Sequence, residues 1–123
     1  MLIGELAKKA GLTRDTVRFY ERAGLIQSGE KQAGSRLYKT FDEAALERLL
    51  FIQGGQAGGF TLREIKEMLD QWGTDLEAAP LQLRISKVQA KIDQTDEKIR
   101  RLEVIRQHLA DKLERMLAAN STN

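Results

Sequence analysis

The chain has 123 residues, of which 41% are hydrophobic and 31% charged, and its 20 basic and 18 acidic side chains give a formal net charge of +2. This length fits one domain, or one small domain with an extension. Because the sequence contains no cysteine, disulfides, thiolate metal sites and cysteine nucleophiles are excluded, and no apolar run approaches the roughly 20 residues of a membrane-spanning helix.

Residues 3–22 predict two short helices joined by a tight turn. Apolar side chains recur at helical spacing over residues 3–10, and Gly11 follows where a left-handed helix end is common. Thr13 is a suitable N-cap for a second helix that runs to about Arg22. Two helices of this size around a glycine turn are typical of a helix-turn-helix unit.

Residues 25–39 predict a small β-hairpin. Leu25 and Ile26 form a short apolar stretch, residues 29–34 form a polar loop, and residues 36–39 alternate in character. We expect the polar loop to join two very short strands that project two or three basic side chains.

Two further helices are predicted after the hairpin, each opened by the spacing of a capping box. The first begins at Thr40–Glu43 and ends near Gly58, and the second begins at Thr61–Glu64. Gly54 and Gly55 lie inside the first helix, where each should cost about 1 kcal/mol relative to alanine. The close approach of a neighbouring helix or of a ligand would account for them, and the sequence leaves both explanations open.

The stretch from Pro80 to about Ala118 contains no further glycine or proline and predicts one long helix. About 38 residues of helix extend over roughly 57 Å. A heptad seam runs along this helix, with polar breaks at Thr95 and Arg106. Short upstream helices cannot cover such a seam, so we expect a second copy of the chain to supply the partner helix. The apolar members of the seam are Ile85, Val88, Ile92, Ile99, Leu102, Leu109, Leu113 and Met116.

Basic side chains gather near the start of the chain and form a stripe on the second predicted helix. Arg14, Arg18 and Arg22 are spaced four apart, on the side opposite Val17 and Tyr20. A solvated helix face would explain such a stripe by itself. The second helix of a helix-turn-helix, however, is the element that enters the major groove, so the stripe favours double-stranded DNA as a partner.

The sequence offers no candidate for catalysis. The Gly54–Gly59 cluster has the spacing of the Walker glycines, but Phe60 and Thr61 stand where a lysine and a hydroxyl residue are required. With no visible nucleophile or isolated acid/base pocket, we expect no enzymatic activity, metal or cofactor. Trp72 lies on the apolar side of a helix end and is interpreted as core, with the wall of an effector pocket beside the long helix as the alternative.

Motifs over residues 2–69 resemble those of MerR-family transcriptional regulators in order and separation. The resemblance implies a mainly α fold, with a winged helix-turn-helix DNA-binding domain and connector helices over residues 1–73. A dimerisation helix over residues 74–119 would form an antiparallel coiled coil, and residues 120–123 would be a disordered tail. The matching motifs are Ile3–Ala7, Gly11–Thr13, Thr16–Glu21, Gly24–Ile26, Arg36–Tyr38, Phe41–Ile52 and Gly59–Ile65.

The resemblance implies a homodimer that binds a palindrome in an overlong promoter spacer. Binding of an effector would let the dimer bend and untwist that spacer, so that RNA polymerase can use both promoter elements. Since the N-terminus lacks the charged and apolar regions of a signal peptide, we expect a cytoplasmic location.

The resemblance places DNA contacts on both the second helix and the wing, which would be the predicted hairpin. Arg14 and Thr16 share the helix face of the matched positions, and Lys39 is an extrapolation along the wing. The positions that match the family's contacts are Arg18 and Tyr20 in the helix and Arg36 and Tyr38 in the wing.

The chain departs from the family's metal and thiol sensors, which carry cysteines at the start of the long helix and just after it. Here those stretches are Leu76–Ala79 and Ala118–Ser121, without a sulfur ligand. Soft-metal sensing by that route is therefore excluded, and the effector is unknown. The alternative to a regulator is a coiled-coil protein–protein module that binds DNA only weakly and non-specifically.

Overall fold

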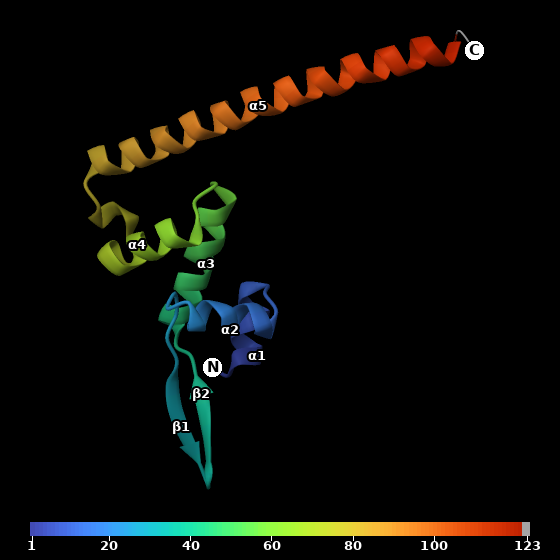
Figure 1. Cartoon of the computed structure of the whole chain (residues 1–123). Helices are drawn as coiled ribbons and strands as arrows, with labels where there is room; N and C mark the ends of the chain where they lie inside the picture. The colour runs from blue at the N-terminus through green and yellow to red at the C-terminus, as the bar shows by residue number, and fades with distance from the viewer. Residues whose placement is uncertain (122–123) are drawn as a thin grey trace. The chain divides into compact units, whose positions relative to one another are not determined.

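The computed structural model describes residues 1–121, and Leu76 by its backbone alone. The chain divides into two compact units, Met1–Pro80 and Leu81–Asn123. Helices dominate both units, and a two-stranded wing belongs to the first (Figure 1). This arrangement confirms the predicted fold class. The division follows Pro80, whereas the sequence suggested a boundary after residue 73.

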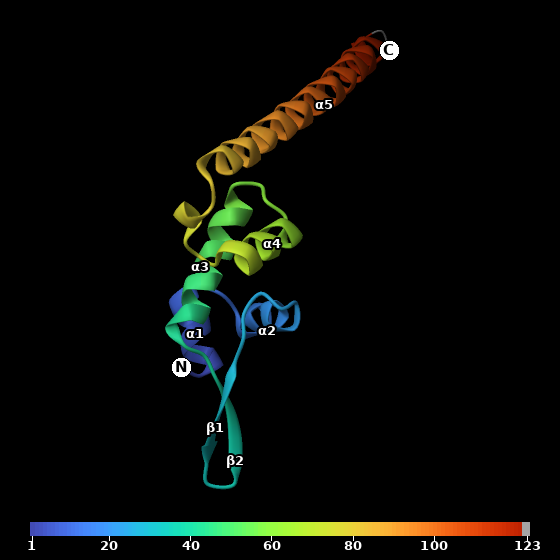
Figure 2. The same ribbon diagram turned by 90° about the vertical axis from the view of Figure 1, so that its left-hand side faces the viewer.

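The helix-turn-helix unit forms as predicted. Helix α1 spans Ile3–Ala10 and ends at Gly11, whose φ of 69° is left-handed. Helix α2 spans Arg14–Arg22, and the Thr13 hydroxyl accepts a hydrogen bond from the Thr16 amide at 3.1 Å. The two helices pack against each other and lie side by side in both ribbon views (Figure 1, Figure 2).

The wing is an antiparallel hairpin of strands β1 (Gly29–Ala33) and β2 (Arg36–Thr40). The expectation that residues 29–34 form a loop is wrong, because most of them form β1. The turn instead contains Gly34, whose φ is 65°. Both strands are exposed along almost their whole length, so no alternation of buried and exposed side chains marks them in the sequence.

The sequence predicts Leu25 and Ile26 to be part of the hairpin. In the structure they instead form a buried link between α2 and the wing. Each side chain is only 1% exposed. The Leu25 amide donates a hydrogen bond to the Tyr20 carbonyl at 2.9 Å, which closes the end of α2. From this link the hairpin projects away from the helices of its unit (Figure 2).

Helices α3 (Glu43–Ala57) and α4 (Leu62–Trp72) follow the wing. The predicted capping box at Thr40 is wrong, since Thr40 is the last residue of β2. The cap of α3 is Asp42, whose carboxylate accepts a hydrogen bond from the amide three residues on at 3.0 Å. The box at Thr61–Glu64 is confirmed, with reciprocal hydrogen bonds of 3.1 and 3.2 Å.

A short 3-10 turn, Leu76–Ala78, precedes helix α5, which spans Leu81–Ser121. The helix thus extends beyond its predicted end near Ala118. Residues 120 and 121 are helical rather than part of a disordered tail, because no glycine or proline interrupts them, and residues 122–123 lie outside the described part. None of the described α5 residues is buried, and the apolar seam members are 47–63% exposed. No described helix is long and apolar enough to cross a membrane.

A single hydrophobic core holds the first unit together, and Gly55 lies at its tightest helix contact. A Cβ atom on Gly55 would lie 2.9 Å from both Cγ1 and Cδ1 of Ile65 on α4, whereas one on Gly54 would meet no described atom within 4 Å. The approach of α4 therefore explains Gly55, and nothing in the structure explains Gly54. The fully buried side chains are Leu6, Val17, Leu25, Ile26, Leu49, Ile52 and Ile65.

Two contacts hold the base of the wing against the helices. Lys39 Nζ lies 2.8 Å from Glu21 Oε1, which joins β2 to α2, and the Phe41 amide donates to the Met1 carbonyl at 2.7 Å. The hydrogen bond from Lys39, with a smaller contribution from Ser28, holds the pKa of Glu21 below its usual value. The exposed wing is therefore fixed at its base.

Alanine substitutions at Gly54 and Gly55 should change stability in opposite directions. Gly54→Ala should raise the free energy of unfolding by about 0.5–1 kcal/mol, because alanine favours helix and has free space there. Gly55→Ala should lower it by about 1–2 kcal/mol, because the new methyl group overpacks the contact with buried Ile65. Denaturant unfolding of the two variants measures both effects, and stabilisation by Gly55→Ala would contradict the close helix approach.

Glu21→Gln should lower the free energy of unfolding near neutral pH, because it removes the charge that pairs with Lys39. The pKa of Glu21 is lower in the folded chain than its usual 4.5. Its contribution is therefore present above that value and is lost as the pH falls through the lowered folded pKa.

The stability difference between wild type and Glu21→Gln should accordingly shrink in acid. Denaturant unfolding from about pH 7 to about pH 3 measures it. Glu47→Gln, which neutralises an exposed glutamate of α3, is the matched control and should change little. A difference that is undiminished in acid would contradict the ion pair.

Candidate nucleic-acid interface

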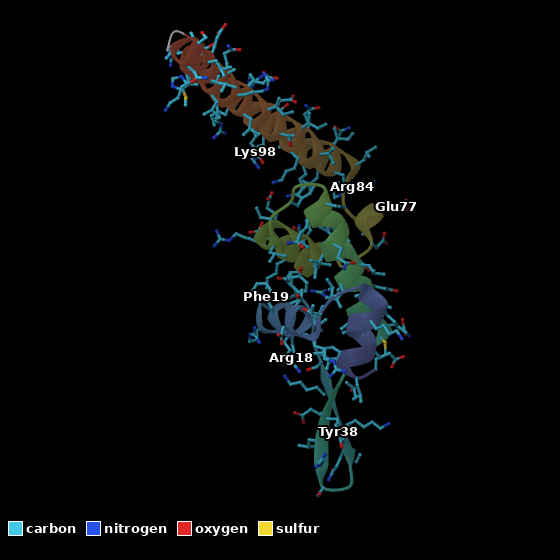
Figure 3. All side chains as sticks on the ribbon, turned by 90° about the vertical axis from the view of Figure 1, so that its right-hand side faces the viewer. Arg18, Phe19, Tyr38, Glu77, Arg84 and Lys98 are labelled. Carbon is cyan, nitrogen blue, oxygen red and sulfur yellow. The ribbon has the colours of Figure 1, made fainter. Side chains whose placement is uncertain are left out.

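Helix α2 presents its basic stripe to solvent. Arg14, Arg18 and Arg22 are all exposed, and Figure 3 labels Arg18 on this helix. Arg18 Nη1 donates a hydrogen bond to Asp15 Oδ1 at 2.9 Å, but the Asp15 side chain is 92% exposed. An exposed ion pair contributes only about 0–1 kcal/mol, so the Arg18 guanidinium can exchange Asp15 for a phosphate at little cost.

The wing offers a second set of exposed polar groups. Arg36 and Tyr38 lie two residues apart on β2 and therefore project from the same face of the hairpin. Tyr38 is 38% exposed and stands opposite Lys31 of β1. Figure 3 shows Tyr38 on the hairpin and Arg18 on α2. The structure thus gives both predicted contact elements exposed cationic or hydrogen-bonding side chains.

Besides Arg18, the predicted contact residues Thr16 and Lys39 also have partners within the chain. The Thr16 hydroxyl lies 2.9 Å from the Thr13 hydroxyl at the start of α2. The Lys39 ammonium group donates to Glu21, so in the free chain it joins the wing to α2. A DNA contact by Lys39 would have to compete with this partly buried carboxylate, whose side chain is 16% exposed.

Tyr20 is placed differently from the other six predicted contact residues. Its side chain belongs to the hydrophobic core and is only 6% exposed. Its hydroxyl donates a hydrogen bond to Gln56 Oε1 on α3 at 3.1 Å. The family pattern assigns Tyr20 to the DNA surface, whereas the helical periodicity places it inward with Val17. The structure agrees with the periodicity.

Phe19 is an exposed aromatic residue of α2 that the sequence reasoning missed. It is 46% exposed, and its ring centroid lies 5.6 Å from that of Tyr20. An exposed phenylalanine beside Arg18 is a signal that could have been found, because Tyr20 already fills the inward position of this pair. Phe19 therefore adds an apolar contact surface beside the basic stripe.

Trp72 is the last residue of α4 and is half-buried. It is absent from the set of fully buried core residues. Its assignment to the wall of an effector pocket stays a prediction.

Models of known families match the chain over most of its length. The model described as the MerR helix-turn-helix family regulatory protein matches residues 1–72. A second model, described as MerR, DNA binding, matches residues 46–112.

Curated relatives are regulatory proteins. The mercuric resistance operon regulatory protein of Bacillus cereus is 36% identical over 113 residues, which cover 92% of this chain and 83% of that protein. The protein of the same description from Shigella flexneri is 41% identical over 69 residues. That match covers 56% of this chain and 46% of that relative, so the chain spans about half of the relative's length.

A solved structure agrees with the sequence matches. A transcription regulator from Ralstonia metallidurans, in complex with lead(II), superposes with a TM-score of 0.73 at 36% identity, over 90% of this chain and 84% of that one. These relatives are transcriptional regulators and not enzymes. The chain therefore belongs to the MerR family of DNA-binding helix-turn-helix transcriptional regulators.

Proposed function

We propose that the chain works in the cytoplasm as a homodimer that binds a palindromic promoter spacer through two copies of its helix-turn-helix and wing. The observation that carries this proposal is the exposed basic face of α2, with Arg14 and Arg18 at its centre. Cationic side chains on this helix supply phosphate contacts and, in the major groove, contacts to base edges. The wing adds Arg36 and Tyr38 on each side.

The dimer is supported by the apolar seam of α5. Residues 1–73 would bind DNA and residues 74–119 would dimerise. Each apolar side chain that becomes fully buried contributes about 1.5–3 kcal/mol, against an association cost of about 4–15 kcal/mol. Two seams of eight apolar residues supply enough burial to offset that cost.

In the proposed mechanism the dimer bends and untwists the spacer. Contacts to both half-sites would offset the deformation energy, of the order of 1–6 kcal/mol for a bend of a short site. RNA polymerase would then use both promoter elements. The sign of this control, activation or repression, depends on whether the dimer holds or releases the polymerase.

Any effector of this chain would have to be bound by chemistry other than thiolate coordination of a soft metal. One relative is described as a mercuric resistance operon regulatory protein, and the solved structure of another is a complex with lead(II). Soft metals of this kind are bound by thiolates. Since no cysteine occurs among the 123 residues, the chain supplies no such ligand. A small organic molecule beside Trp72 fits the aromatic side chain better.

Selection of bound duplexes from a random library should enrich an inverted repeat at roughly physiological salt, where non-specific phosphate binding is suppressed. Arg18→Glu should abolish binding to that repeat while the dimer remains intact, because it reverses a charge at the centre of the α2 face. Glu114→Arg, an exposed reversal near the end of α5, is the control. Uniform weak binding without enrichment would support the coiled-coil interaction module instead.

Introduced cysteines should report the antiparallel dimer directly, because the natural chain has none. When two seams overlap along their whole length in opposite directions, Ile85 faces Met116 of the second copy. Ile85→Cys mixed with Met116→Cys should therefore form a disulfide-linked dimer under mild oxidation. Neither variant should cross-link alone, since like positions would be about 46 Å apart along the helix axis and a disulfide needs Cα atoms within about 7 Å.

Ile85→Cys mixed with Leu109→Cys tests a register shifted by one heptad and should give no product. Cross-linking of Ile85→Cys with itself would indicate a parallel dimer and contradict the proposed arrangement.

A further inference from the structure

The segment that follows α2 is held by side chains from two other helices. Gly24, with φ of 78°, turns the chain out of α2, and the next carbonyl, that of Leu25, accepts a hydrogen bond from Arg48 Nε of α3 at 2.7 Å. The Lys66 side chain of α4 crosses the same turn, since its Cε lies 3.1 Å from the position of a Cβ on Gly24. The segment that follows α2, the proposed recognition helix, therefore contacts α3 and α4 at one place.

A carboxylate on α4 completes this contact. Asp70 Oδ2 lies 2.7 Å from Lys66 Nζ, and Asp70 Oδ1 lies 3.9 Å from an Arg48 Nη2 atom. Arg48 thus faces a backbone carbonyl after α2 on one side and a charge on α4 on the other. Its side chain is 27% exposed, so solvent screens it less than it screens the surface pairs of α2.

The extensive packing contact of α4 is with α3 and not with α2. Helix α1 packs on α2 and α3, and α3 packs on α4. The polar contacts of Arg48 are a shorter connection, because they run from Asp70 on α4 to the Leu25 carbonyl, and the Lys66 side chain lies against Gly24 beside them. A cavity of about 340 Å³ lies beside them and is lined by residues that include Gly24, Gln27, Asp42, Arg48 and Asp70.

We infer that Arg48 is a positioning residue that fixes the orientation of the recognition helix and wing relative to α4, and that specific DNA binding depends on it. This inference rests on the proposed DNA-binding function. Arg48 would act through Leu25 and Asp70 and would not touch the DNA. Through Arg48, a displacement of α4 would change the orientation of α2.

Arg48→Met tests the inference, since it keeps the apolar stem of the side chain and removes its hydrogen bonds. Its affinity for the selected duplex should fall about tenfold or more, the size expected when a charge-assisted hydrogen bond is lost. Affinity for an unrelated duplex should stay nearly unchanged. The salt dependence of specific binding should also keep its slope, because no phosphate contact is lost, whereas loss of a direct contact would lower the slope by about 0.9.

Two further variants make the test decisive. Asp70→Asn leaves the hydrogen bond to Leu25 in place and removes the charge on α4 that faces Arg48, together with the ion pair of Asp70 with Lys66. It should therefore give a smaller loss in the same direction. It also replaces Arg48→Met if that variant fails to fold. Arg100→Met removes an exposed arginine of α5 that pairs with Glu97 and is the charge-matched control, which should bind as the wild type does.

The outcomes separate this inference from the proposed function. If wild type enriches no duplex, the proposed function fails and the inference with it. If wild type binds its repeat and the folded Arg48→Met or Asp70→Asn proteins keep the full ratio of specific to non-specific affinity, only the positioning role is overturned. A loss accompanied by a lower salt slope would also overturn it, by showing that Arg48 contacts phosphate.

Discussion

Both elements that are proposed to contact DNA, α2 and the wing, extend from one buried pair of residues, Leu25 and Ile26. Helix α2 ends at Arg22, shortly before this pair, and the wing begins at Gly29, shortly after it. Because both side chains enter the same core at 1% exposure, the chain cannot change direction here without opening that core. The backbone of Leu25 is bonded on both sides, to Tyr20 through its amide and to Arg48 through its carbonyl. The orientations of α2 and of the wing are therefore not independent of each other.

Signals that rest on local chemistry could be predicted from the sequence. The left-handed turn at Gly11 and the caps at Thr13 and Thr61 depend only on residues within one helical turn. The cap of α3 was predicted at Thr40 but is Asp42, because both residues are good caps and stand two residues apart. The choice between them depends on where β2 ends, and that is set by its pairing with β1.

The wing and the core could be predicted less well, because neither leaves a local pattern. The strands of the wing are exposed on both faces, so burial imposes no period of two on them, and only residues 36–39 of β2 alternate in character. Leu25 and Ile26 look like a short strand until the surrounding helices are in place. Gly55 is intelligible only through Ile65, which lies on the next helix.

In the candidate site, too, local geometry predicts some residues and not others. The spacing of Arg14 and Arg18 predicts an exposed stripe, because helical geometry alone determines it. Tyr20 shows where the family pattern and periodicity disagree, and burial resolves the disagreement. The role of Arg48 could not have been predicted, since its partner is a backbone carbonyl 23 residues away, which no side-chain pattern encodes.

The wing has only two strands, and both of its outer edges carry unpaired backbone groups exposed to water. A hairpin of this kind is marginally stable on its own, so the wing is held mainly at its base, where β1 begins and β2 ends. In the proposed complex, the tip would lose conformational freedom when the duplex is bound. That loss of conformational entropy is the same for every base sequence. It therefore lowers the affinity for every duplex by the same factor, and discrimination among duplexes is left to α2.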